Sequence, residues 1–139
     1  MSEPVRRPPP SNPAMLPLMG AVVGLAGIVA LWGILSLVLD RDPIDYPDAG
    51  PLLGPAMVVA ATVVTGLVAY RVRRPWPAVA LAFVGSLLAM LIVAGIGYGL
   101  TRGSLEWMLL APAHFAIGPF VPGAAALCAL VTLGVRVLR

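Results

Sequence analysis

The chain has 139 residues, of which 60% are hydrophobic and only 11% are charged, whereas about 25% of the residues in a typical soluble domain are charged. Its net charge is +3, but every basic residue is an arginine, and the arginines lie scattered between apolar runs, which argues against a nucleic-acid-binding face. The composition predicts an all-α membrane protein, and its abundance of Ala, Gly, Pro and Arg is typical of a GC-rich bacterial genome.

Residues 1–17 form a proline-rich segment, which is incompatible with a helix because proline removes a backbone donor and clashes with the preceding turn. We expect an extended, disordered tail there. The charge-free run 18–39 is longer than the core of a signal peptide, and no convincing cleavage site follows it. Residues 18–39 are therefore expected to remain as the first membrane-spanning helix.

Three further apolar runs can each cross about 30 Å of hydrocarbon at about 1.5 Å per residue. The expected spans are 51–70, 77–100 and 119–138, which join 18–39 in a compact bundle of four transmembrane helices within the domain 18–139. A soluble fold would need helices that are apolar on every side with almost no polar surface to cover them. The lipid bilayer is thus the expected partner of most of the chain.

The last apolar run, 107–135, is too long for one straight span, because a helix over it would be about 43 Å long. It also contains Pro112, Pro119 and Pro122. Since proline is tolerated in the first turn of a helix, we expect the fourth span to begin near Pro119 and residues 104–117 to lie along the membrane interface. A single, strongly tilted helix is the alternative.

Two stretches share a pattern at an offset of 68 residues: GPLLGPA from Gly50 and GPFVPGA from Gly118. At the same offset Arg71 falls on Arg139. This match indicates two tandem helical hairpins in the same orientation. The other explanation is that glycine followed by proline is a common way to begin any helix.

The arginines are unevenly divided between the two ends of the expected helices. Seven lie in the tail, the 71–76 connection and the C-terminus, and two lie in the remaining connections: Arg6, Arg7, Arg71, Arg73, Arg74, Arg136 and Arg139 against Arg41 and Arg102. Arginine-rich connections stay in the cytoplasm. Both termini are therefore expected in the cytoplasm, with the chain in the plasma (inner) membrane.

The expected spans contain no Asp, Glu or Lys, and no Arg in their interior. Ion-coupled and proton-coupled carriers keep an ionisable residue at membrane depth, so this class of transporter is not expected. The polar residues of the spans can hydrogen-bond to a backbone carbonyl or across helices: Ser36, Thr62, Thr65, Ser86, Cys128 and Thr132.

Three residues could be functional sites by residue type, but their sequence surroundings favour structural roles. Cys128 is the only cysteine, so it cannot form a disulfide within the chain and is expected to be a packing residue. His114, the only histidine, is expected near the outer interface, without a nearby Cys or Asp to make it a metal ligand or catalytic base. Trp32 is expected to pack inside the bundle. With no catalytic motif present, no enzymatic residue and no cofactor is predicted.

The stretch 39–56 holds four of the six acids and is the minority candidate for a metal site: Asp40, Asp42, Asp45 and Asp48. Their spacing does not match a calcium loop, which needs alternate oxygen ligands, a central glycine and a closing glutamate. A carboxylate at Asp48 would stabilise the start of the second span. A solvated loop that forms the turn is therefore favoured, and contact with a protein partner outside the membrane is a further alternative.

Small residues recur at helical spacing in two of the expected spans. The pairs are Gly20-x-x-x-Gly24 in the first span and Gly95-x-x-x-Gly99 in the third. Glycines at this spacing let two helices approach closely. They favour a compact bundle without specifying a particular dimer.

The stretches LSLVLDRD and PDAGPLLGPAM after the first span, together with GPFVPGA at the start of the fourth, resemble a family of small four-span actinobacterial membrane proteins of unknown function. The resemblance covers nearly the whole chain. It implies the four-span fold, but it implies no activity and no functional residue.

Two functions remain open. The leading hypothesis is a non-enzymatic integral membrane protein, an accessory or structural bundle that contacts a membrane-protein partner through its helix faces and its outer loop. The alternative is a small transporter or channel that acts as a homo-oligomer with a pore between subunits, although no span carries the polar stripe that lines such a pore.

The expected threading is tested by cysteine labelling in a Cys128→Ala background. A membrane-impermeant thiol reagent should label the Asp45→Cys variant in intact cells, because the acidic loop is expected outside. It should label the Arg73→Cys variant only after the cells are opened. The reverse pattern would overturn the orientation derived from the arginines.

Overall fold

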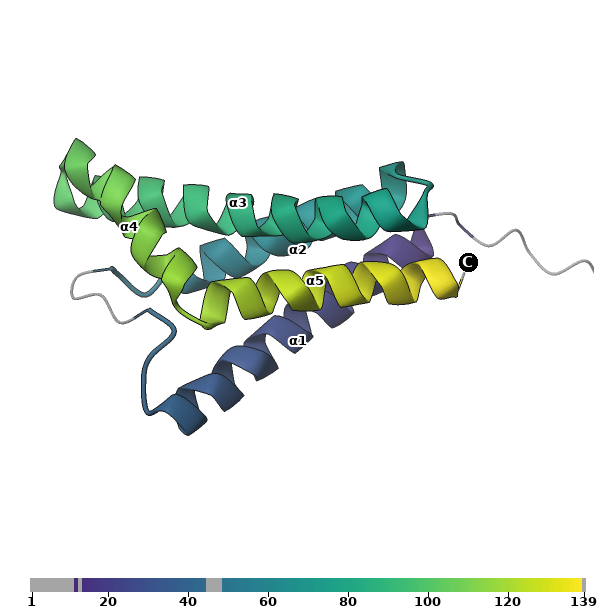
Figure 1. Cartoon of the computed structure of the whole chain (residues 1–139), viewed down its shortest axis with the longest axis horizontal. Coiled ribbons are helices and arrows are strands. Elements are labelled where there is room, and N and C mark those ends of the chain that lie inside the picture. Colours follow the sequence, from purple (N-terminus) through teal and green to yellow (C-terminus); the bar gives the residue numbers. More distant parts are fainter. Residues whose placement is uncertain (1–11, 13, 45–48, 139) are drawn as a thin grey trace, which may run out of the picture.

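The computed structural model describes residues 12, 14–44 and 49–138, and within these ranges the chain forms five helices and no strand (Figure 1). The helices are α1 (Met15–Leu39), α2 (Leu53–Arg71), α3 (Pro75–Arg102), α4 (Leu105–Ile117) and α5 (Phe120–Val137). Four of them, α1, α2, α3 and α5, are long and apolar enough to cross a membrane, and they pack together. The prediction of an all-α bundle with four apolar helices is therefore confirmed.

The bundle has two distinct ends. At the end that we call the arginine end, the start of α1 and the end of α5 lie near the α2–α3 turn, residues 72–74 (Figure 1). The opposite end, which we call the loop end, holds residues 40–44 and 49–52 together with α4. Helix α3 packs against α2, α4 and α5, whereas α1 contacts only α2 and α5 among the described helices.

The helix boundaries differ from the expected spans by a few residues. Helix α1 begins at Met15 and so includes Pro17, which the sequence assigned to the tail. Helix α3 begins at Pro75 and not at residue 77. Both differences have one cause: the amide groups of a first helical turn have no partner within the helix, so proline is accepted there. The rest of the expected tail, residues 1–11 and 13, lies outside the described residues.

The long apolar run near the C-terminus is divided into two helices. Helix α4 ends at Ile117, and α5 begins at Phe120, with Gly118 in an extended conformation and Pro119 at the N-terminal cap. The alternative of one tilted helix over 107–135 is therefore wrong. Whether α4 lies along a membrane interface stays a prediction.

The two glycine-proline stretches that suggested tandem hairpins adopt different conformations. Gly50 has a left-handed φ of 73°, whereas Gly118 has a φ of −69°. Helix α4 also lies in the connection from α3 to α5, whereas the described residues between α1 and α2, 40–44 and 49–52, form no helix. The duplication stays a prediction, and the α1–α2 and α3–α5 connections differ in conformation.

Helix α4 folds back on the last turns of α3 because glycine leaves room for it. A Cβ atom on Gly95 would lie 2.7 Å from the carbonyl oxygen of Met108 and 3.0 Å from Cγ of Pro112. At the same corner, the guanidinium carbon of Arg102 lies 5.7 Å from the ring centroid of Tyr98 and 5.8 Å from that of Trp107. This geometry is typical of cation–π attraction.

The other glycine pair also serves packing within the chain. A Cβ atom on Gly20 would lie 2.6 Å from Cγ2 of Val135 on α5, and one on Gly24 would lie 3.9 Å from Cγ1 of Val131. Both glycine pairs therefore bring two helices of the same chain together, a choice that the motif alone left open.

A comparison of two glycine variants tests this packing. Gly95→Ala is expected to lower the free energy of unfolding by about 1–3 kcal/mol, because the new methyl group meets a backbone oxygen that cannot move without distorting α4. Gly33→Ala is the control, since nothing lies within 4 Å of a Cβ atom there. Unfolding of both variants in the same detergent is the measurement, and equal stabilities would contradict the proposed close approach.

Candidate functional site at the loop end

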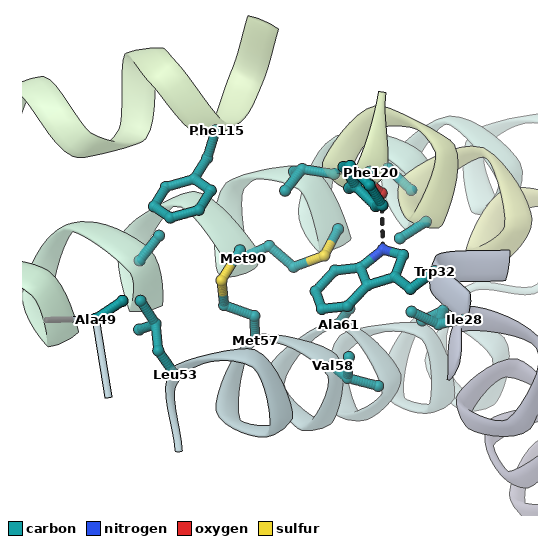
Figure 2. Packing of buried hydrophobic residues seen from close by; sticks show 14 of the residues in the cluster. Ile28, Trp32, Ala49, Leu53, Met57, Val58, Ala61, Met90, Phe115 and Phe120 are labelled. Atoms are coloured by element: carbon teal, nitrogen blue, oxygen red, sulfur yellow. Dashed lines mark hydrogen bonds between the residues drawn. The ribbon is translucent and has the colours of Figure 1, made fainter. Parts of the chain in front are cut away.

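Trp32 joins α1 to the beginning of α5. Its side chain is buried, and its Nε1 donates a hydrogen bond of 2.9 Å to the carbonyl oxygen of Phe120 (Figure 2). The two rings also meet edge to face, with centroids 6.4 Å apart, a favourable arrangement for aromatic side chains. The expectation that Trp32 packs inside the bundle agrees with this position.

Beyond Trp32, α1 runs obliquely to α5, and its C-terminal end lies away from the other helices (Figure 1). The last turn of α1 is correspondingly exposed: Leu37 is 86% exposed and Val38 is 74% exposed. The divergence leaves room between the end of α1, the following loop and the α4–α5 turn.

That space is a pocket of about 310 Å³, which we call the loop-end pocket. Its polar lining comes from Arg41 and Asp42 after α1 and from His114 on α4. Its apolar lining includes Leu39, Phe115 and Phe120. The pocket therefore combines a permanent cation, a carboxyl group and an imidazole with aromatic walls.

The sequence places Arg41 and Asp42 through the way that α1 ends. Asp40 takes a left-handed conformation with φ of 50°, and its backbone N–H donates to the carbonyl oxygen of Ser36. The N–H of Arg41 donates to the same oxygen at 3.3 Å, and the hydroxyl of Ser36 donates to the carbonyl oxygen of Arg41 at 2.7 Å. These bonds satisfy backbone groups at the helix end and fix the direction in which the chain leaves α1.

His114 lies on the last turn of α4, with its side chain exposed. Its Nδ1 is 3.4 Å from the carbonyl oxygen of Leu110. If this contact is a hydrogen bond, Nδ1–H is the donor, because a carbonyl oxygen only accepts.

The structure divides the four aspartates that the sequence grouped. Asp42 lines the loop-end pocket, whereas Asp40 is not among its lining residues. Asp45 and Asp48 lie outside the described residues. Across the described ranges, no three His, Cys, Asp or Glu side chains are close enough together to hold a metal ion, so the metal hypothesis gains no support from Asp40 and Asp42.

The proximity of Asp42 and His114 is a finding that the sequence did not predict. We expected His114 to lack a nearby Asp; among the described residues no contact between His114 and Asp42 is observed, but the two residues line the same pocket. They are far apart in the chain and belong to no motif. Only the packing of α1 against α5 and the turn at Pro119 bring their segments together.

Two larger, mainly apolar grooves run along the line where α1 packs against α2. The first, of about 690 Å³, lies toward the arginine end and includes Leu18, Leu25 and Tyr70. The second, of about 680 Å³, lies toward the loop end and includes Trp32, Gly54 and Asp42. Asp42 therefore borders both the loop-end pocket and the second of these grooves.

The chain matches the model of a family of unknown function, DUF6121, over residues 11–139. It belongs to this family. The resemblance to a family of unknown function is therefore confirmed. No curated protein and no solved structure shows significant similarity to the chain.

The role of Trp32 can be tested by comparing two tryptophan variants of this family member. Trp32→Phe is expected to lower the free energy of unfolding by about 1–2 kcal/mol, because the indole N–H and its bond to the Phe120 carbonyl are lost. Trp76→Phe is the matched control, since Trp76 is 79% exposed. Thermal unfolding in detergent measures both, and equal effects would show that the buried bond contributes nothing.

Proposed function

We propose that the chain is an integral, multi-pass protein of the plasma membrane that acts as a non-enzymatic accessory or structural subunit. The observation that carries this proposal is the exposure of α1. In the most apolar 18-residue stretch of α1, only 17% of the residues are buried within the chain, whereas 44% are buried in the corresponding stretches of α2 and α5. Helix α1 is thus attached by one side and offers most of its apolar surface to lipid or to another transmembrane helix.

The proposed orientation places both termini in the cytoplasm. Support comes from the arginine end, which holds Arg71, Arg73, Arg74 and Arg136. Arg136 Nη2 donates a 2.9 Å hydrogen bond to the carbonyl oxygen of Ala69 near the end of α2, where a cation is favourable for the helix dipole. Arg41 and Arg102 lie at the loop end, so the positive charge is concentrated on one side.

The hydrogen bonding of the buried polar side chains supports the accessory role over a transport role. The buried polar side chains of the described residues are Thr62, Thr65, Ser86 and Thr132. Each of these hydroxyl groups donates to the carbonyl oxygen of the residue four positions earlier in its own helix. Groups satisfied in this way do not form a polar path for an ion or a solute.

The α1–α2 grooves give the proposed contact surface its shape. Both are lined mainly by apolar side chains, and the exposed residues Val22 and Val29 of α1 belong to these linings. A partner helix that packs here would gain van der Waals contact in place of lipid, which is the main driving force for helix association in a bilayer.

Photocrosslinking in cells tests the proposal. A photoreactive amino acid at Val22 or Val29, which are 61% and 59% exposed, should give one product of the same discrete mass from both positions. Leu88 on α3 is the matched control, because it is 51% exposed but lies away from α1 and is expected to face only lipid. Purification in mild detergent should recover the crosslinked partner in stoichiometric amount.

Two outcomes would count against the accessory role. A homogeneous monomer without crosslinks from α1 would contradict it directly. Crosslinks between copies of the chain, together with solute flux into liposomes above background, would replace it with the homo-oligomeric transporter or channel.

A further inference from the structure

We propose that the loop-end pocket binds the headgroup of a zwitterionic phospholipid that carries a primary ammonium group, the phosphatidylethanolamine class. In this arrangement the guanidinium group of Arg41 binds the lipid phosphate, and the carboxyl group of Asp42 accepts hydrogen bonds from the ammonium group. The inference rests on the proposed membrane location, but it does not require a protein partner.

The position of the pocket matches the depth of lipid headgroups. Leu39 is the last residue of α1 and Phe120 is the first residue of α5, and both line the pocket. Helix α1 has 25 residues and is therefore about 37 Å long, which exceeds a hydrocarbon thickness of about 30 Å. The residues at its end thus reach the polar zone of the bilayer.

The charges that line the pocket favour a ligand with both signs of charge. Arg41 and Asp42 are adjacent in sequence and both line it. A guanidinium group pairs well with a phosphate through two parallel hydrogen bonds. The carboxylate of Asp42 would repel a purely anionic headgroup, and the guanidinium group of Arg41 would repel a purely cationic ligand.

The carboxyl group also distinguishes a primary ammonium from a quaternary one. A primary ammonium group has three N–H donors, whereas a quaternary group has none. Choline headgroups carry the same charges as ethanolamine but cannot donate a hydrogen bond to Asp42. The imidazole of His114 lines the same pocket and adds a further polar group to it.

The size of the pocket and its surroundings point to a lipid held by its headgroup. About 310 Å³ is at the lower end of the range for small-molecule sites, so the pocket holds a headgroup and not a whole lipid. Exposed apolar side chains lie at the pocket: the lining residue Leu39 is 41% exposed, and Ile117, which precedes the lining residue Gly118, is 85% exposed. Acyl chains can lie against these side chains while the headgroup occupies the pocket.

Lipid titration of the purified protein tests the inference. Thermal unfolding in detergent micelles is followed while phosphatidylethanolamine, phosphatidylcholine or phosphatidylglycerol with the same acyl chains is added. We expect phosphatidylethanolamine to bind at least about 10-fold more tightly than phosphatidylcholine, since one charge-assisted hydrogen bond contributes roughly that factor. Native mass spectrometry should show one tightly bound lipid per chain.

Two variants and one matched control assign the binding to the pocket. Asp42→Asn should reduce the preference for ethanolamine over choline to less than about 3-fold, and Arg41→Gln should weaken the binding of both lipids by about 10-fold. Asp40→Asn removes the same charge two positions before Asp42, from a residue that does not line the pocket. Asparagine tolerates the left-handed conformation of that residue, so the control should bind like the unmodified chain.

The inference fails if the unmodified chain binds ethanolamine and choline lipids equally, a result that does not depend on the folding of any variant. It also fails if Asp40→Asn and Asp42→Asn have the same effect. Soluble glycerophosphoethanolamine is the third arm: it should bind at least 10-fold more weakly than the lipid, and equal binding would identify a free headgroup as the ligand. Since the titration uses purified protein, its failure leaves the photocrosslinking result of the accessory role untouched.

Discussion

The buried hydrogen bond from Trp32 to the Phe120 carbonyl group ties the second half of α1 to the first residue of α5. In a bilayer the hydrophobic effect does not hold helices together, because lipid is as apolar as the side chains, so hydrogen bonds and close packing have to do so. Helix α1 has one such bond, from Trp32, and one close approach to α5, at Gly20. Phe120 lines the loop-end pocket, and Trp32 lines the α1–α2 groove that lies toward the loop end.

Prolines and glycines shape the opposite side of the bundle. The turn at Gly118 and Pro119 directs α5 back through the bundle, and Gly95 allows α4 to pack directly on α3. Helix α4, packed on α3, contributes His114 and Phe115 to the lining of the pocket. The chemistry of the pocket thus depends on residues that have no functional group of their own.

The two candidate roles use different parts of the molecule. The accessory role uses the lipid-facing surface of α1 along its length, whereas the headgroup site uses only the polar residues after its last turn. A bound lipid at the loop end would fill the space that the divergence of α1 leaves open, and its acyl chains would cover exposed residues such as Ile117. The two roles are therefore compatible, and a lipid there would also limit how far α1 can move.

The sequence by itself determined the number of apolar helices, the approximate ends of each helix and the concentration of arginine at one end. These properties follow from length, hydropathy and proline position, which act locally along the chain. The break before α5 was also predictable, because Pro119 is favoured at the start of a helix and follows Gly118, a residue that weakens a continuous helix.

Only the tertiary structure decided which residues meet. The glycine pairs could have served a dimer, and their use within one chain depends on where α4 and α5 lie. Asp42 and His114 share a pocket although no pattern links them, because their proximity results from the angle of α1 and the turn at Gly118. Helix formation depends on neighbouring residues, which the sequence records directly, whereas a site between helices depends on packing between distant segments.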